Sequence, residues 1–378
     1  MTKGIQETVG NRNFSIIIIT HNRERLLMES IQSVLAEIKR YEGTCEILVI
    51  NSSEKAYHFK KPIKEIYVPN IIPASSKRNI GIGAAKYQWL LFMDDDCKMS
   101  QDALKTAAKY ISKKNGDGTA GFYCITRFGA GVRFPLRCCL NTHFTSSFSW
   151  AKQMEKMPWG PTSLAILKKN ILEDIGGFDE NFSALIGGED VDIGMRLNEK
   201  NYILYGIPEV LVYHNTESWN KFIFNLKRFY RYGKCDTDLQ VKHKKYTHLK
   251  LNSMLFPVLY NLLLLLGCYL LNIKRNRVYL IFPFYLLFNS LLFYWHYYKS
   301  YKKNLGESLV LRIYDWTYEV GNLISSLKKK KIRPLFFRSH SDIRNHNRLF
   351  WGRHKVLYQD ERVEIFSLLF TLIFFIYI

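Results

Sequence analysis

The chain has 378 residues, too many for one minimal core, so its length predicts two folded units or one domain with an appendage. Its net charge of +21 is unevenly placed, because residues 216–378 hold 27 Lys and Arg against 10 Asp and Glu, a net charge of +17. Such a basic region binds nucleic acid or anionic lipid, and its apolar runs exclude nucleic acid in favour of lipid.

The seven cysteines contain no C-x-x-C pair and only one adjacent pair, Cys138-Cys139. This usage predicts reduced thiols in a cytosolic compartment rather than a disulfide scaffold. Residues 1–13 are polar and the first apolar run, residues 14–19, is short, so we expect no signal peptide.

The N-terminal half alternates between strand and helix patterns. Buried strands are expected at residues 14–20, 45–50, 65–68 and 89–93, and helices at residues 25–39 and 76–87. Continuous apolar strands separated by helices predict an α/β fold with a mostly parallel sheet covered on both faces.

Polar residues follow three of these strands, where open α/β sheets bind ligands. These residues are Thr20-His21-Asn22-Arg23, Asn51-Ser52-Ser53 and Asp94-Asp95-Asp96. They predict a nucleotide site without a phosphate-binding glycine loop, since neither G-x-G-x-x-G nor G-x-x-x-x-G-K-[ST] occurs. The alternative for the first group is an ordinary helix-capping loop with Asn22 as the N-cap.

The three aspartates come directly after the apolar run of residues 89–93. Carboxylates two residues apart on a turn can share a hard divalent cation that neutralises a leaving phosphate. The alternative is a solvated acidic turn.

A second acidic group lies about 90 residues further on. A Gly176-Gly177-Phe178-Asp179-Glu180 turn precedes Gly188-Glu189-Asp190-Val191-Asp192, which opens a predicted helix. Acidic residues cap helix N-termini, yet three carboxylates in four residues exceed what a cap needs. Asp190 is therefore predicted to be a general base for an acceptor hydroxyl.

These motifs, in this order, resemble the family 2 glycosyltransferases of GT-A fold over roughly residues 14–235. The resemblance implies an inverting enzyme with a nucleotide-sugar donor and a divalent cation, Mn²⁺ or Mg²⁺. The implied catalytic residues are Asp190 and Glu189, and the implied metal ligands are Asp94, Asp96 and His214. The implied donor-binding residues are Thr20, His21, Asn22, Arg23, Asn51, Arg78, Asn79, Asp94 and Asp95. Acceptor contacts are expected from Trp159 and Asp192, although a core tryptophan is the alternative for Trp159.

Two positions depart from the family pattern. Asn51 stands where an aspartate usually reads the nucleobase, so the resemblance does not identify the base. Residues 228–233 replace the Q-x-x-R-W signature of processive synthases, which favours single-sugar addition. Arg228 and Arg231 either stabilise the departing diphosphate or face anionic lipid.

The C-terminal part carries two runs without Asp, Glu, Lys or Arg, residues 252–273 and 278–298. Each is long enough for a membrane helix, but basic residues before, between and after them conflict with the positive-inside rule. A hairpin dipping into the inner leaflet resolves the conflict, and a buried core hairpin is the alternative. Trp295 and the basic run 328–331 favour a lipid surface. The apolar run 366–378 has no assigned role.

The predicted organisation is a tail (1–13), a GT-A domain (14–235), a linker and helical hairpin (236–303), and a basic C-terminal region (304–378). The predicted fold is thus an α/β GT-A (Rossmann-like) domain followed by membrane-associated helices. The predicted function is transfer of one sugar to a glycan or lipid-linked acceptor at the cytoplasmic face of the cell membrane. The alternatives are a polyprenyl-phosphate glycosyltransferase and a non-catalytic membrane scaffold.

Overall fold

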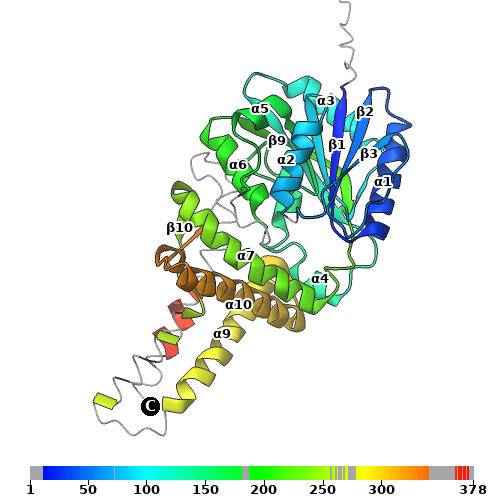
Figure 1. The fold of residues 1–378 in the computed structure, drawn as a ribbon. Helices are drawn as coiled ribbons and strands as arrows, with labels where there is room; N and C mark the ends of the chain where they lie inside the picture. The colour runs from blue at the N-terminus through cyan, green and yellow to red at the C-terminus, as the bar shows by residue number, and fades with distance from the viewer. Residues whose placement is uncertain are drawn as a thin grey trace, which may run out of the picture. The chain divides into compact units, whose positions relative to one another are not determined.

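The computed structural model describes residues 12–71, 73–180, 187–255, 258–259, 262, 266, 269–270, 278–339, 362–363, 365–367, 369–371 and 373. The chain forms two compact units (Figure 1). Unit 1 comprises Met1–Gly131 and Ser146–Thr216, and unit 2 comprises Val132–Thr145 and Glu217–Ile378.

Unit 1 is built on one sheet, with strand order β3-β2-β1-β4-β8-β6-β9-β5 and with β7 paired to β9. The strands are β1 (Phe14–Thr20), β2 (Cys45–Asn51), β3 (Ile63–Tyr67), β4 (Trp89–Asp94), β5 (Cys97–Met99), β6 (Thr119–Phe128), β7 (Lys156–Met157), β8 (Leu164–Lys168) and β9 (Ile203–His214). The predicted α/β class is confirmed. The sheet is mixed rather than mostly parallel, because β5, β7 and β8 run antiparallel to their neighbours. Between β6 and β8 the helical segments, Phe134–Cys139 and Ser146–Lys152, are shorter than the crossover helix that usually joins parallel strands.

The helices of unit 1 lie against this sheet (Figure 1). They are α1 (Glu24–Ile38), α2 (Ala74–Ala84), α3 (Ala103–Lys114), α5 (Lys169–Asp174) and α6 (Glu189–Glu199), with a 3₁₀ turn, η1 (Ser146–Lys152). The apolar stripes of α1 and α3 pack with Ile16 and Ile18 of β1 in one core cluster. α2 meets the opposite side chain of the same strand: a Cβ on Gly81 would lie 2.5 Å from Ile17. Helices on both faces explain why the strands are apolar throughout.

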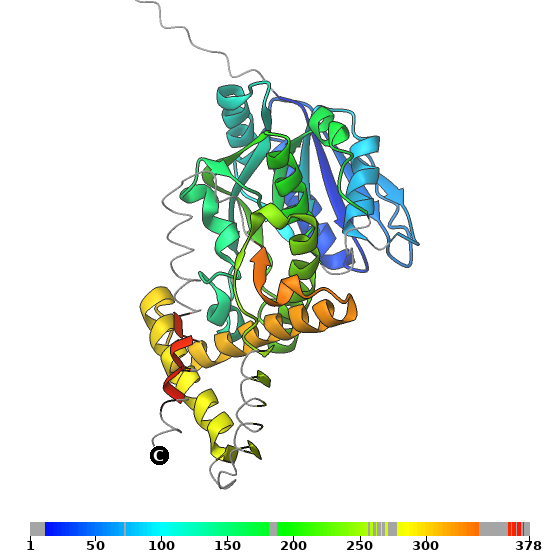
Figure 2. The same ribbon diagram turned by 90° about the vertical axis from the view of Figure 1, so that its left-hand side faces the viewer.

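Unit 2 is mainly helical. It contains α4 (Phe134–Cys139), α7 (Phe222–Lys242), η2 (Lys244–Tyr246), α9 (Val278–Tyr301), α10 (Leu305–Lys328) and η4 (Arg333–Leu335), with the antiparallel pair β10 (Thr247–Leu249) and β11 (Phe337–Ser339). α7 and α10 lie side by side (Figures 1 and 2). A capping box at Asn304 and Glu307 starts α10.

The second unit resumes at Glu217, and its helix α7 packs against α10. The predicted end of the GT-A domain at residue 235 falls inside α7 and stays a prediction. The predicted run 278–298 forms most of α9, whereas runs 252–273 and 366–378 lie largely outside the described residues. Within the described part of the chain, no helix is both long and apolar enough to cross a membrane.

Candidate active site

The carboxyl ends of three parallel strands meet at one edge of the sheet. Thr20 at the end of β1 is paired with Asn51 of β2, and Ile19 is paired with Asp94 of β4. The loops that follow these strands therefore start side by side. This register brings together the three polar groups that the sequence predicts as one site.

Asp95 fastens the loop after β4 to the end of β1. Its side chain accepts a hydrogen bond from the Thr20 hydroxyl at 2.7 Å and forms an ion pair with Arg23 at 3.1 Å. Arg23 also contacts Asp96 at 3.1 Å. Burial raises the pKa of Asp95 to about 6, against the opposing effect of Arg23. Because Asp95 is only 5% exposed, its contacts position the loop, and its predicted contact with the donor stays a prediction.

Asn51 fixes the conformation of the loop after β2. Its amide nitrogen donates to Glu65 at 2.7 Å and to the Lys55 carbonyl at 3.0 Å, and its amide oxygen accepts from the Ser53 amide at 2.8 Å. The side chain is fully buried, so these partners, and not a nucleobase, satisfy its polar atoms. The predicted base contact of Asn51 stays a prediction.

His21 and Asn22 link the loops after β1 and β2. The His21 ring nitrogen Nδ1 lies 2.9 Å from the Ser52 carbonyl, and the Asn22 amide donates to the Ser53 hydroxyl at 2.8 Å. Arg23, not Asn22, is the N-cap residue of α1, and Asn22 takes a left-handed conformation with φ of 53°. His21 and Asn22 are exposed, so donor binding by these two residues stays a prediction.

Lys77 is a buried cation that sequence reasoning did not single out. Its ammonium group donates to the Thr20 carbonyl at 3.1 Å and to the Ser52 hydroxyl at 3.0 Å. Burial lowers its pKa to about 8. Its place beside Arg78 in the first turns of α2 was the available signal.

Arg78 joins the two acidic motifs. One guanidinium nitrogen lies 2.6 Å from Glu189, and the other lies 3.1 Å from Asp94 and 2.7 Å from the Thr162 hydroxyl. Burial alone would lower the pKa of Arg78, but the two carboxylates outweigh this and raise it. The planar guanidinium group of this buried arginine therefore fixes the distance between Asp94, at the end of β4, and the first turn of α6.

Asp190 lies in the first turn of α6, which follows Gly188 with φ of 93°. Its carboxylate accepts a hydrogen bond from the Val191 amide at 2.9 Å. Burial and then the neighbouring Glu189 raise its pKa to about 7, against the lowering effect of Arg78. A carboxyl group with this pKa can accept a proton near neutral pH.

Two other predicted site residues are structural. The Asn79 side chain donates a hydrogen bond to the Phe178 carbonyl at 2.8 Å and accepts one from the Phe178 backbone amide at 2.8 Å. These bonds connect α2 to the turn at Gly176-Gly177. Asp192 is fully buried and paired with Arg196 at 2.9 Å. Both side chains are engaged within the fold, and the predicted donor contact of Asn79 and acceptor contact of Asp192 stay predictions.

Replacing Asp192 by asparagine is expected to destabilise the protein by about 2 kcal/mol, since a charge-assisted bond to Arg196 is weakened in a buried site. Thermal unfolding would measure the loss. Glu199→Ala, an exposed change on the same helix, is the matched control and should shift the midpoint little. Equal midpoints for Asp192→Asn and Glu199→Ala would contradict this assignment.

Trp159 is half-buried. Its ring meets Trp150 edge to face, with centroids 4.9 Å apart, and its Cβ lies against Gly194 of α6. Packing therefore accounts for much of this side chain, and its predicted contact with an acceptor sugar stays a prediction.

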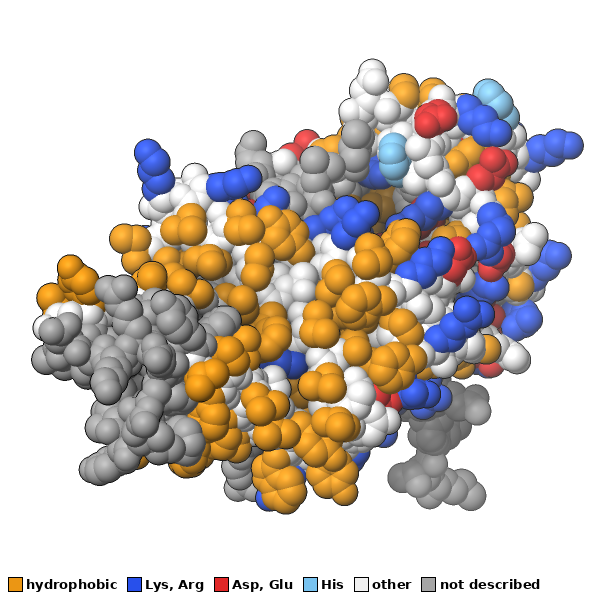
Figure 3. Space-filling view, turned by 90° about the horizontal axis from the view of Figure 1, so that it is seen from below, with side chains coloured by type: hydrophobic (Ala, Val, Ile, Leu, Met, Phe, Trp, Pro, Cys, Tyr) orange, Lys and Arg blue, Asp and Glu red, His pale blue; other side chains and the backbone are white. Residues whose placement is uncertain are grey.

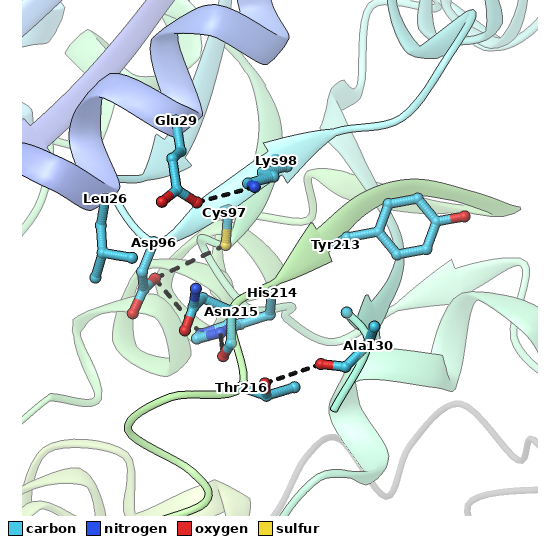
Figure 4. A pocket seen from close by; sticks show the side chains of 11 residues that line it. Leu26, Glu29, Asp96, Cys97, Lys98, Ala130, Tyr213, His214, Asn215 and Thr216 are labelled. Carbon is cyan, nitrogen blue, oxygen red and sulfur yellow. Dashed lines mark hydrogen bonds and ion pairs between the residues drawn. The ribbon is translucent and has the colours of Figure 1, made fainter. Parts of the chain in front are cut away.

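A group of potential metal ligands lies at the end of β9. Within the described residues, the ligand atoms of Asp96, Cys97 and His214 lie within 4.8 Å of one another. They meet because β5 pairs with β9 so that Cys97 is opposite His214. They line a pocket of about 180 Å³ together with Glu29, Lys98 and Tyr213 (Figure 4). Asp94 is not in this group, because its carboxylate contacts Arg78.

The chemistry of this group fits a divalent cation held by Asp96 and His214. The His214 nitrogen Nδ1 lies 2.8 Å from the Asn215 carbonyl, which places its proton there and its lone pair on Nε2. Nε2 lies 3.6 Å from Asp96. Burial and the three aspartates raise the pKa of the Cys97 thiol well above its usual range, and a soft sulfur ligand suits Mn²⁺ or Mg²⁺ less well than carboxylate oxygen does.

Comparisons with known proteins find similarity over part of the chain. The chain is 27% identical over 216 residues to the minor teichoic acid biosynthesis protein GgaB of Bacillus subtilis (strain 168), covering 54% of this chain and 23% of GgaB. The chain thus spans about a quarter of that relative's length.

Two solved structures are among those similar to the chain. Mannosyltransferase PcManGT from Pyrobaculum calidifontis, in complex with GDP-Man and Mn²⁺, matches with a TM-score of 0.47 and 12% identity, covering 97% of this chain and 87% of that one. GalNAc-T7 with UDP, GalNAc and Mn²⁺ matches with a TM-score of 0.41 and 19% identity, covering 54% and 43%. Residues 15–176 match the family model described as glycosyl transferase family 2, and the chain therefore carries a family 2 glycosyltransferase domain, as its motifs predict.

Proposed function

We propose that this chain transfers a single sugar, with inversion, from a nucleotide sugar to a hydroxyl group of a glycan or lipid-linked acceptor at the cytoplasmic face of the cell membrane. The observation that carries the proposal is the Arg78 bridge. It holds Asp94, at the end of β4 beside the predicted donor-binding loop, and Glu189, next to the predicted base, at one fixed spacing. A transferase that joins a donor to an acceptor needs both groups placed together.

In this mechanism Asp190 takes the proton from the attacking hydroxyl, whose oxygen displaces the diphosphate from the anomeric carbon on the opposite face. Asp96 and His214 would hold a divalent cation, which when bound neutralises negative charge on the leaving diphosphate. Lys77 and Arg23 add fixed positive charge at the same edge of the sheet.

The relative's name supports a class of acceptor. GgaB is described as a teichoic acid biosynthesis protein, so we propose a cell-surface polymer or its lipid-linked precursor as the acceptor. Incubating the purified chain with a panel of nucleotide sugars and such acceptors tests the function. Glycosylated product from at least one pair is expected, and retained transfer to polyprenyl phosphate by Asp190→Asn would favour the alternative enzyme, because an ionised phosphate needs no base.

Metal-dependent nucleotide binding provides a further prediction. A nucleoside diphosphate with Mn²⁺, at about 100 times its Kd, should stabilise the wild type by roughly 2.7 kcal/mol in a thermal-shift assay. Asp96→Asn and His214→Ala should lose most of this gain. Asp102→Asn, an exposed aspartate of unit 1, should keep it. Full Mn²⁺-dependent stabilisation in both site variants would show that these residues do not hold the cation.

A further inference from the structure

Helix α10 buries many polar residues, beside the apolar Leu311 and Tyr314, and exposes a stripe of apolar ones. Its buried side chains include Glu307, Ser308, Arg312, Glu319, Asn322, Ser325 and Ser326. Leu305, Leu309 and Ile313, spaced four residues apart on one face, are 51%, 45% and 39% exposed. A helix on the surface of a water-soluble domain has the opposite arrangement, with its apolar stripe facing the core.

Small and polar residues contribute to the contact between α7 and α10, beside the ring contact of Phe229 with Tyr314. A Cβ on Gly233 of α7 would lie 1.9 Å from the Tyr318 carbonyl, and a Cβ on Gly321 of α10 would lie 2.1 Å from the Tyr230 carbonyl. Beside them the Asn322 amide donates to the Thr237 hydroxyl at 3.3 Å. Helices that lack a hydrophobic driving force between them, as in lipid, associate through such close backbones and polar bonds.

Helix α9 buries Tyr285, Phe293 and Tyr297 but also exposes a stripe of apolar residues. Leu287, Leu291 and Trp295 are 63%, 53% and 57% exposed and lie on one face. On its other side Asn289 is fully buried and accepts a hydrogen bond from Arg312 of α10 at 2.9 Å. Both helices thus direct apolar side chains outward.

Lysine side chains accompany the exposed aromatic residues of this surface. The Lys299 ammonium lies 4.5 Å from the centre of the Trp295 ring, and the Lys302 ammonium lies 6.0 Å from that of Tyr298. Lys328, the last residue of α10, and Lys329 to Lys331 after it are all exposed. Figure 3 shows hydrophobic side chains gathered over a broad part of the face that it draws, with Lys and Arg side chains at its border. Aromatic residues paired with lysines are typical of a lipid–water boundary.

We propose that this surface of unit 2, defined by Leu305, Leu309 and Ile313 of α10 and Leu287, Leu291 and Trp295 of α9, docks on an anionic lipid bilayer, with α10 lying in the plane of the headgroups. α10 carries Glu307, Arg312, Asp315 and Glu319, and such a charged helix lies at the interface rather than across the bilayer. The net charge of +17 in residues 216–378 attracts anionic headgroups and repels a second copy of the chain. The inference rests on the membrane location in the proposed function, but not on sugar transfer.

Flotation of the full chain with lipid vesicles tests the proposal. We expect the wild type to float with phosphatidylcholine vesicles that contain phosphatidylglycerol, and to float poorly with phosphatidylcholine alone. The triple variant Leu305→Asn, Leu309→Asn, Ile313→Asn should partition at least roughly tenfold less, because its apolar area is lost. The control Met28→Asn, Tyr67→Asn changes exposed apolar residues of unit 1 and should float like the wild type.

Three outcomes would overturn the proposal. The first is a triple variant that floats as well as the wild type while its circular dichroism spectrum is unchanged. The second is equal flotation of the wild type with neutral and with anionic vesicles. The third is a wild type that does not float but forms a dimer, when the triple variant forms no dimer. The last outcome would assign the surface to a second copy. Donor turnover does not enter this readout, so failure of the transfer reaction and failure of lipid docking are distinguishable.

Discussion

Asp190→Asn is expected to lower kcat for sugar transfer by about three orders of magnitude, while the Kd for the donor changes little. The reason is that an asparagine of almost the same shape cannot take the proton of the acceptor hydroxyl, and general base catalysis contributes roughly 10²- to 10⁴-fold. Asp174→Asn, an exposed carboxylate that pairs with Lys200, is the matched control and should keep wild-type turnover. Wild-type kcat for Asp190→Asn would exclude this residue as the base.

The pH dependence follows from the same carboxylate. Its pKa is raised to about 7, so its carboxyl group is protonated and inactive at lower pH and becomes available as a base as the pH rises through 7. We therefore expect kcat/KM to fall about tenfold per pH unit below this value. A profile that stays flat between pH 5 and 7 would contradict the assignment.

Arg78→Met is expected to reduce the free energy of unfolding by about 3 kcal/mol, because it leaves Asp94 and Glu189 without their shared cation. The exposed pair Arg25–Glu29 offers a matched control, and Arg25→Met should cost less than about 1 kcal/mol. Thermal or urea unfolding measures both variants. Equal unfolding of Arg78→Met and the wild type would show that the bridge does not hold the two motifs.

The same variant has a catalytic signature that loss of stability alone would not produce. Arg78 lowers the pKa of Asp190, so its removal should move the acidic limb of the kcat/KM profile to higher pH. Arg78→Lys keeps a charge without the fork, and is expected to restore part of the stability but to leave turnover well below the wild type. If the acidic limb of the Arg78→Met profile did not move, Arg78 would have no influence on the pKa of the base Asp190.

The strands of unit 1 could be predicted because their apolar runs are continuous and end in polar turns. β1 occupies Phe14–Thr20 as expected, and β4 ends at Asp94. The sheet's mixed direction could not be predicted, since β8 is only five residues long and strand direction depends on the path of the connection. α10 was not predicted, and its sequence pattern alone would not show that its polar face is the buried one.

The motifs of the site could be predicted from residue types and order, but the partners of each side chain could not. Glu65, which accepts a hydrogen bond from Asn51, lies 14 positions from it in the sequence, and Glu189, which pairs with Arg78, lies 111 positions from it. These pairings depend on tertiary packing, which a short motif does not encode. For this reason Asp95, Asn51, Asn79 and Asp192 were predicted to contact ligands, although the structure uses them to hold loops and helices together.

The most direct test of the account is product formation by the wild type and by Asp190→Asn, assayed with a panel of nucleotide sugars, Mn²⁺ and hydroxyl acceptors. The account predicts that the wild type releases nucleoside diphosphate and forms an inverted glycoside with at least one donor. It also predicts that Asp190→Asn binds that donor but forms almost no product. A wild type without turnover or metal-dependent nucleotide binding, or a retained anomeric configuration in the product, would contradict it.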